Sequence, residues 1–443
     1  MDQTQTPAVL EKISLAAARE RAYEKASRNL RDLAGLEVSA KQVQRVAIRL
    51  GNERLEEQDR RIERYQNATL LEQRYGQPDD APQNDWSGRA AVVQADGGRA
   101  QIRDDLWGKE KPGDKRHRWW RETQCGVLQT YLSKPSDEDP HPEVPAALTD
   151  PLWAVPRFNE IHRGHVARPV SESCGEGNGS DEGAAFEDAR ASGASDLHTP
   201  QESAAPPPSQ PNGVAKAGGK KQAPPRWSGG PPLVKTVVAT RRGYDHLGLA
   251  LAAEAYHRGF NKASAKAFLG DGLKVNWSLW QRHFSRYTPI ADLMHALSYV
   301  YAAAVACGST IEDGWRLYLR WLGWVWAGDV PRVIEAMQEI AGSRAESLEP
   351  LERAITYLRN NASRMQYAEY RRAGLPITTA MVESTQKQIN WRVKGTEKFW
   401  KDENLEPLLQ LVTDDLSDTH DREQFWKRRR ARFTGFRNRR AKT

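Results

Sequence analysis

The clearest alternation of apolar and polar positions lies between residues 266 and 298. A short apolar run at 267–269 predicts a strand that stops at Asp271, which stands between two glycines. The next apolar residues fall at helical spacing, and a second short run, 287–291, predicts another strand, which ends at Asp292. Strand, helix and strand in this order are typical of an α/β fold. Such folds place chemistry at the carboxyl ends of their strands, where both aspartates fall.

A helical pattern follows Asp292. His295 comes three residues later, and residues three apart at the start of a helix share one face. Apolar residues then keep helical spacing to about residue 372, with four tryptophans among them. The stretch 297–375 is therefore predicted to be an all-helical insertion. Its tryptophans fit either a helical core or a surface on which bases stack.

The N-terminal residues 1–76 also have the periodicity and composition of helices. Gly35 is a natural helix stop, and Ser39 is placed to cap the next helix. Two helices joined by a tight turn, here residues 35–38, are typical of a helix-turn-helix DNA-binding region, and equally of an ordinary helical hairpin. A linker rich in proline and aspartate, residues 77–87, separates this region from the next.

Short β-prone runs follow in residues 88–170. The first run ends at Asp96, whose two following glycines predict a hairpin turn. Residues 100–102 then predict the returning strand, and residues 123–132 predict a third strand. Asp96 is either an ordinary hairpin aspartate or a carboxylate with a chemical role at the end of a strand.

The composition changes sharply between residues 171 and 232. Glycine, serine, alanine, proline and aspartate predominate there, and large apolar residues nearly vanish. Such a segment buries too little apolar surface to fold, so it is predicted to be a disordered insertion. The sheet pattern resumes in residues 233–296, which contain the strands ending at Asp271 and Asp292.

Residues 376–420 are predicted to supply the last helix of the sheet domain. A proline and two threonines end one element and cap this helix. Its apolar positions mark a buried side, and Glu383, Lys387 and Lys394 share the polar side. Glu383 and Lys387 by themselves also fit a plain surface ion pair of the i,i+4 type.

Positive charge is concentrated at the C-terminal end. The net charge is +7, and residues 425–443 hold nine Lys or Arg and no acidic residue, so the rest of the chain is close to neutral. Residues 421–443 are predicted to be a basic tail that binds phosphate, or else a plain solvated tail. Four aromatic residues are available in it for stacking: Phe425, Trp426, Phe433 and Phe436.

Two further features exclude classes of protein. No apolar run approaches the ~20 residues that a membrane span requires, so no membrane partner is expected. The three cysteines are scattered and form no metal or disulfide pattern, which fits a reducing cytosol.

Four motifs together resemble a bacterial insertion-sequence transposase of the RNase H-like DDE class, close to the ISKra-type group. They are QADGGRAQIR with Asp96, FLGDGLKVNW with Asp271, ADLMHALSYVYAAA with Asp292 and His295, and PITTAMVESTQKQINWRVKGTEKFW with Glu383. They follow the family's order, with the helical block between the third and the fourth. One departure is Thr378-Thr379-Ala380, where some relatives have a Gly-Ser-Gly turn.

The resemblance implies an α/β fold: an RNase H-like mixed sheet interrupted by the helical insertion. It also implies that Asp96, Asp271 and Glu383 are a catalytic, metal-binding triad, with Asp292 and His295 as an accessory motif. Two Mg²⁺ or Mn²⁺ ions would stabilise the attacking and leaving oxygens of a phosphodiester, and Mg²⁺ prefers carboxylates. His295 fits a hydrogen bond to a carboxylate or phosphate, and equally a packing role.

The implied activity is metal-dependent strand cleavage and strand transfer of an insertion sequence, in the bacterial cytoplasm at the nucleoid. Expected partners are double-stranded DNA, as element ends and target, and a second copy in a homo-oligomer. The residues predicted to contact DNA are Lys387, Arg392, Lys394, Lys427, Arg428, Arg429, Arg430 and Arg432. Two alternatives stay open: a nuclease of the same fold that cuts without joining, and a transposase-derived DNA-binding protein with a silent site.

Overall fold

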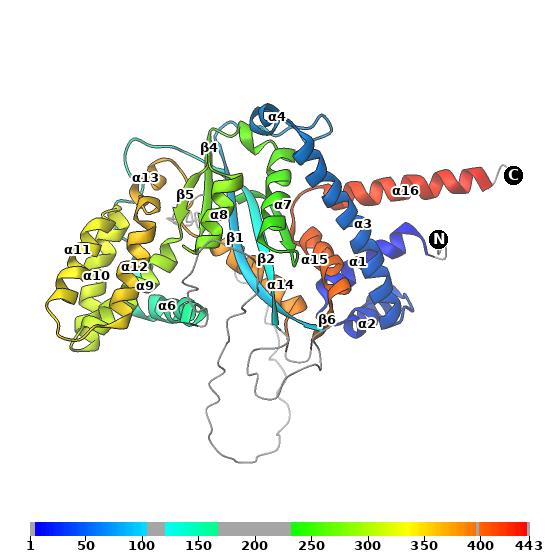
Figure 1. Cartoon of the computed structure of the whole chain (residues 1–443). Coiled ribbons are helices and arrows are strands. Elements are labelled where there is room, and N and C mark those ends of the chain that lie inside the picture. The colour runs from blue at the N-terminus through cyan, green and yellow to red at the C-terminus, as the bar shows by residue number, and fades with distance from the viewer. Residues whose placement is uncertain (1–4, 104–119, 167–231, 396–397, 441–443) are drawn as a thin grey trace, which may run out of the picture.

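The computed structural model describes residues 5–103, 120–166, 232–395 and 398–440 (Figure 1). The disordered insertion predicted at 171–232 lies outside these residues, apart from its last one. A mixed sheet stands at the centre with helices on both faces, so the predicted α/β class with a mixed sheet is confirmed. No helix within the described ranges is both long enough and apolar enough to cross a membrane.

The strands of the described residues form one six-stranded sheet. They are β1 (Arg89–Arg103), β2 (Trp120–Leu132), β3 (Pro232–Thr240), β4 (Ala265–Gly270), β5 (Thr288–Ala291) and β6 (Phe399–Lys401). The order is β3-β2-β1-β4-β5, with β1 to β3 antiparallel and with β4 and β5 parallel to β1. β6 pairs in parallel with the far end of β1. The longest strand therefore lies in the middle of the sheet.

β1 runs straight through the hairpin turn predicted at Asp96, so that prediction is wrong. The strand stays in register with β2 from Asp96 to Gly98, and neither glycine there has the positive φ that a tight hairpin turn needs. Gly98 instead leaves room for a neighbouring side chain, because a Cβ there would lie 2.1 Å from Nε2 of Gln386. Residues 100–102 consequently belong to β1, and residues 123–132 to the second strand.

The two faces of the sheet carry different helices. α7 (Tyr244–His257) and α8 (Lys274–His283) share a core with Val93 and Ala95 of β1, and η1 (Phe260–Lys262) follows α7. Side chains alternate along a strand, so Asp96 points to the opposite face. α14 (Ala380–Val393), α15 (Asp402–Leu416) and the N-terminal helices cover that face.

The N-terminal region is helical, as predicted. It comprises α1 (Pro7–Arg19), α2 (Tyr23–Ala34), α3 (Ala40–Asn67) and α4 (Leu70–Tyr75). Gly35 ends α2 with a left-handed φ of 61°, and Ser39 caps α3 in a capping box with Gln42. α1, α2 and α3 share a core with the sheet and α15. At Gly51 the contact is so close that a Cβ would lie 2.2 Å from the backbone oxygen of Pro407.

A helical block lies between β5 and α14, on the side of the sheet away from the N-terminal helices (Figure 1). It consists of α9 (Leu293–Cys307), α10 (Ile311–Ala327), α11 (Val330–Gly342), α12 (Glu349–Asn361), η2 (Ala362–Arg364) and α13 (Tyr367–Arg372). α5 (Ala146–Thr149) and α6 (Pro151–Val166) pack against it. Trp321 and Trp326 are each 1% exposed, which favours a helical core over a base-stacking surface.

The C-terminal segment forms a helix, α16 (Asp421–Arg440), which projects from the body in Figure 1. Phe425 and Trp426 are buried in the core that α1 and α3 share, so the prediction that these two are available for stacking is wrong. Burial of these two large aromatic side chains removes apolar surface from water, and this stabilises the packing of the first turns of α16 on the body. Phe433 is half-buried, and the side chain of Phe436 lies outside the described residues.

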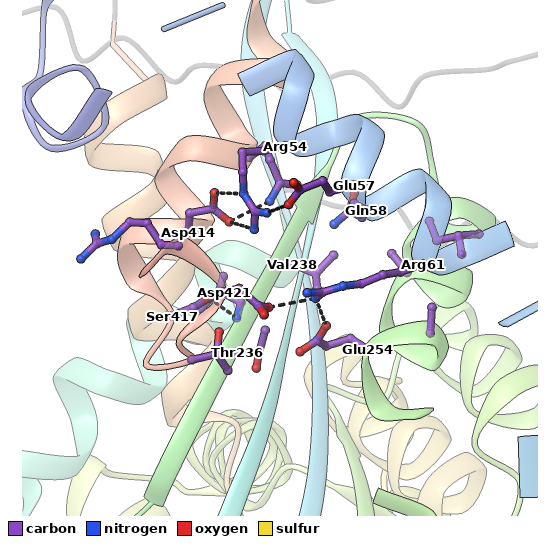
Figure 2. A pocket seen from close by; sticks show the side chains of 17 residues that line it. Arg54, Glu57, Gln58, Arg61, Thr236, Val238, Glu254, Asp414, Ser417 and Asp421 are labelled. Carbon is purple, nitrogen blue, oxygen red and sulfur yellow. Dashed lines mark hydrogen bonds and ion pairs between the residues drawn. The ribbon is translucent and has the colours of Figure 1, made fainter. Parts of the chain in front are cut away.

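Buried and half-buried ion pairs tie α3 to α7 and to the C-terminal helices (Figure 2). Arg54 of α3 donates to both carboxylate oxygens of Asp414 on α15, at 2.7 and 3.1 Å. Arg61 lies between Glu254 of α7 and Asp421 of α16, at 3.0 and 2.9 Å. A charged group is stable away from water only beside a partner of opposite charge. These pairs therefore fix the relative positions of segments up to 360 residues apart in the sequence.

Candidate active site

Asp96, Asp271 and Asp292 stand in one row across three neighbouring parallel strands. Leu269 of β4 pairs with Gln94 of β1 on one side and with Ile290 of β5 on the other. Each aspartate lies two residues after one of these paired residues: Asp96 after Gln94, Asp271 after Leu269 and Asp292 after Ile290. β4 and β5 end before their aspartates. Three segments that are far apart in the sequence therefore bring carboxylates to one edge.

The first turn of α14 brings Glu383 to the same place. Gln94 is fully buried on β1 and accepts a hydrogen bond from the backbone N–H of Val382 at 3.1 Å. The N–H of Thr379 donates to Oδ1 of Asp292 at 2.6 Å, and the Thr379 hydroxyl donates to Oε1 of Glu383 at 3.0 Å. The sheet thus holds the start of the helix that carries Glu383.

Asp292 is fully buried, and both of its carboxylate oxygens accept hydrogen bonds. Oδ2 lies 2.7 Å from the backbone N and 2.7 Å from Nδ1 of His295, and Oδ1 accepts the Thr379 bond. Burial alone would raise the pKa of Asp292, but the bonds from His295 and Thr379 lower it below its ordinary value. Asp292 therefore caps α9 as an ionised carboxylate and ties α9 to α14.

His295 lies between two carboxylates. Its Nδ1 is 2.7 Å from Asp292 and 3.9 Å from Oε1 of Glu383. Burial lowers the pKa of His295, but the bond to Asp292 and the charges of Asp292, Asp271 and Glu383 raise it to about 9. The imidazole is protonated at neutral pH and balances part of the negative charge. Of the two roles considered for His295, this geometry favours the hydrogen bond.

Negative charge is crowded around Glu383. Burial and the charges of Asp292 and Asp96 raise the pKa of Glu383, while His295 and Thr379 act in the opposite direction. The Glu383 side chain is 31% exposed, so it can be reached from solvent. A site that holds like charges together in this way favours the binding of a cation.

Asp271 is oriented by the start of α8. Its Oδ1 accepts the backbone N–H of Leu273 at 3.0 Å and Nδ2 of Asn276 at 2.8 Å. The residue is only 7% exposed. These two bonds fix the carboxylate at the point where β4 ends.

The donor set fits a hard divalent cation. In the described part of the chain, Asp292, His295 and Glu383 form a group whose ligand atoms lie within 4.8 Å of one another. Asp292 and His295 are bonded to each other, and Asp292 also accepts the N–H of Thr379 at the start of α14, which suits them to position the site. The carboxylates of Asp96, Asp271 and Glu383 are oxygen donors of the kind that Mg²⁺ and Mn²⁺ take.

Arg392 does not lie where DNA could reach it, and its predicted DNA contact is wrong. It is 2% exposed, and its Nε donates to the Ala17 carbonyl at 2.8 Å. Its guanidinium lies over the rings of Tyr23 and Trp400. The helical turn places Arg392 on the side of α14 that faces α1 and α2, so it fastens those helices to α14.

Lys387 and Lys394 lie on the solvent side of α14. Lys387 is 66% exposed and pairs with Glu160 of α6 at 2.9 Å. Lys394 is exposed, with its Nζ 5.2 Å from the centre of the Trp120 ring. Their contact with DNA stays a prediction.

The basic residues of α16 divide into two groups. Arg428, Arg429 and Arg430 pair with the acidic residues Glu57, Glu53 and Glu11 on α3 and α1. Lys427 and Arg432 are exposed. Part of the positive charge is thus balanced within the molecule, and the DNA contacts predicted for this helix stay predictions.

Gln94 and Thr379 are two residues of the site that were not predicted from the sequence. Gln94 gives one signal, since it is a polar residue at the end of an otherwise apolar run in β1. Thr379 gives none, because its bonds to Asp292 and Glu383 depend on how α14 meets the sheet.

No protein-family model matches the chain, and no curated protein matches its sequence.

Proposed function

We propose that the protein is a metal-dependent DNA transposase of the RNase H-like DDE class, which cleaves the ends of an insertion sequence and joins them to a target. One observation carries the proposal: Asp96, Asp271 and Asp292 stand in register at one edge of the sheet, and the ligand atoms of Asp292, His295 and Glu383 there lie within 4.8 Å of one another. Along the chain these residues follow the order of the motifs that resemble this family. A first strand that carries an aspartate and opens a three-stranded antiparallel unit also supports an RNase H-like sheet.

Asp96, Asp271 and Glu383 would bind two Mg²⁺ or Mn²⁺ ions, which when bound activate the attacking oxygen and stabilise the leaving one. α8 keeps Asp271 in position, and the loop held by Asp292 keeps Glu383 in position. His295 holds its proton beside Glu383, where it offsets negative charge as a phosphate approaches.

The substrate in this proposal is double-stranded DNA, as element ends and as target. Lys387 and Lys394 on α14 and the exposed basic residues of α16 supply positive charge for the DNA phosphates. Two element ends must be paired for transposition, so we propose a homo-oligomer that acts at the bacterial nucleoid in the cytoplasm.

The test is cleavage of a DNA carrying the flanking element ends, in Mg²⁺ or Mn²⁺. We expect Asp271→Asn, which keeps the shape of the side chain, to lose at least about a hundredfold in rate, since a metal ligand stabilises transition-state charge. Asp313→Asn is the matched control, because Asp313 is a 39% exposed aspartate on α10. It should cut at the wild-type rate.

The products decide among the alternatives. Joined products that depend on Asp271 support the transposase, and nicks without joining support a nuclease of the same fold. DNA binding without any cutting by the wild type, in either metal, would overturn the catalytic proposal and favour a silent DNA-binding protein.

A further inference from the structure

Two buried tyrosines of the helical block reach the strand ends that carry the candidate site. The hydroxyl of Tyr357 on α12 donates to the backbone carbonyl of Asp271 at 3.0 Å. The hydroxyl of Tyr367 on α13 donates to the carbonyl of Ala291, next to Asp292, at 3.0 Å. We propose that Tyr357 and Tyr367 are positioning residues through which the helical block holds the site's carboxylates in place.

Tyr357 packs directly on the turn that follows Asp271. Gly272 has a φ of 97°, and a Cβ there would lie 2.5 Å from the Tyr357 ring. The turn can therefore adopt its left-handed conformation and accept the ring only with glycine. This contact gives the glycine after Asp271 a structural reason.

Tyr357 is itself held from behind. Its ring stacks on Tyr299 of α9, with ring centres 4.1 Å apart and planes at 14°. The amide of Asn361 donates to the Tyr357 carbonyl at 3.0 Å and accepts Nε1 of Trp277 on α8 at 2.8 Å. The tyrosine thus belongs to a fixed bridge between α12, α9 and the helix that orients Asp271.

Tyr367 holds the end of the neighbouring strand, β5, through its bond to Ala291. It is fully buried, and Tyr370 of the same helix adds a longer bond, 3.4 Å, to the carbonyl of Pro289 in β5. β4 and β5 are last paired at Gly270 and Ala291. Just beyond that pair the N–H of Asp292 still donates to the Gly270 carbonyl at 2.9 Å, and the two tyrosine hydroxyls add bonds to the carbonyls of Asp271 and Ala291 at the same strand ends.

Both hydroxyls remain donors over the whole working pH range. Burial raises the pKa of Tyr357 and of Tyr367 well above the ordinary value, and nearby aspartates add to the effect. They bond to backbone carbonyls, so their role is positional. Two-metal chemistry needs carboxylates held to within about 0.5 Å, which loosely held strand ends do not provide.

The inference that this positioning serves metal binding rests on the proposed function, and the test separates the two. Tyr357→Phe and Tyr367→Phe each remove one hydroxyl and keep the ring. The matched control is Tyr318→Phe, a fully buried tyrosine of the same block whose hydroxyl donates to the Leu148 carbonyl at 3.1 Å, away from the site.

Amide hydrogen exchange on the full-length protein reports positioning without metal. We expect amides 272–276 to exchange about tenfold faster in Tyr357→Phe, and amides 292–295 in Tyr367→Phe, as one lost hydrogen bond implies. Tyr318→Phe should leave both segments unchanged. Exchange that is unchanged in the first two variants, or changed equally in all three, would overturn the positioning role.

Mn²⁺ titration of the same proteins, without DNA, tests the link to the site. Variants of such outer residues lose about tenfold or more in metal affinity, and we expect this for Tyr357→Phe but not for Tyr318→Phe. Wild-type affinity in Tyr357→Phe overturns the link between this tyrosine and the metal. Wild-type affinity in Asp271→Asn overturns the proposed metal centre instead, whatever the exchange rates show.

Discussion

Individual side chains at the site differ in how their charge is balanced. Asp292 is fully buried, and its lowered pKa comes with three hydrogen bonds. His295 supplies positive charge next to Asp292 and Glu383. The pH at which His295 loses its proton therefore reports on the whole cluster.

The raised pKa of His295 predicts a pH-dependent contribution to stability. Its folded-state pKa is about 9, above the ordinary 6.5 of an unfolded chain. The contribution is fully present below pH 6.5 and is lost as the pH rises through about 9. Urea unfolding in EDTA should show the advantage of the wild type over His295→Gln shrinking by up to about 3 kcal/mol across this window.

Asp292→Asn gives a second measure of the same effect, because the bond to Asp292 is the main cause that raises the pKa of His295. This variant should lose the pH dependence along with part of its stability. A stability difference between wild type and His295→Gln that stays constant from pH 6 to pH 10 would contradict the charge assignment.

At the scale of elements, α14 and α16 each have one side packed on the body and another in solvent. α14 packs Val382, Ile389 and Arg392 toward the core and turns Lys387 and Lys394 outward. Trp391 is 50% exposed on that outer side. α16 is anchored through its aromatic residues and its paired arginines.

The exposed basic residues of α16 predict a salt effect on DNA binding. Each phosphate contact contributes about 0.9 to the slope of log affinity against log salt. We expect the double variant Lys427→Gln with Arg432→Gln to lower the slope by up to about 2, measured by fluorescence anisotropy on duplex DNA. Its thermal stability should match the wild type, because both side chains are exposed.

Arg316→Gln is the control for this experiment, since Arg316 is 75% exposed on α10, in the helical block. It should keep the wild-type slope. An unchanged slope in the α16 variant would mean that this helix does not touch DNA, and the prediction for its basic residues would then be withdrawn.

At the scale of the whole molecule, the first and last helices are joined to the sheet as one body. α1 to α3 share a core with β1, β2, β3 and α15, and the ion pairs of Figure 2 run through the same region. Arg54 is buried among Asp414, Glu57 and the ring of Phe425. We therefore expect the N-terminal helices to unfold together with the sheet.

Removing the Arg54 charge tests this expectation. Arg54→Gln leaves the partner carboxylates buried without their cation, which destabilises a protein by about 3–5 kcal/mol. Arg64→Gln, on the same helix, breaks an exposed pair with Asp80, whose side chains are 54% and 64% exposed, and should lower stability by less than about 1 kcal/mol. Chemical unfolding should show a single transition in both, and an early separate loss of helical signal would indicate an independent N-terminal domain.

Local pattern determined much of this molecule. The helices, the strands that end before Asp271 and Asp292, and the caps at Gly35 and Ser39 all follow from spacing and residue type. They do so because the interactions that define them lie within a few residues along the chain. The predicted α/β class rests on the same local signals.

Tertiary structure decided what local pattern could not. Asp96 reaches the site from within a long strand, because Gly98 leaves room for the Gln386 side chain and forms no turn. Arg392 is a buried anchor and Trp426 a core residue, although both occur in polar, basic surroundings in the sequence. In each case the deciding partner lies far away along the chain, and only the fold sets the distance to it.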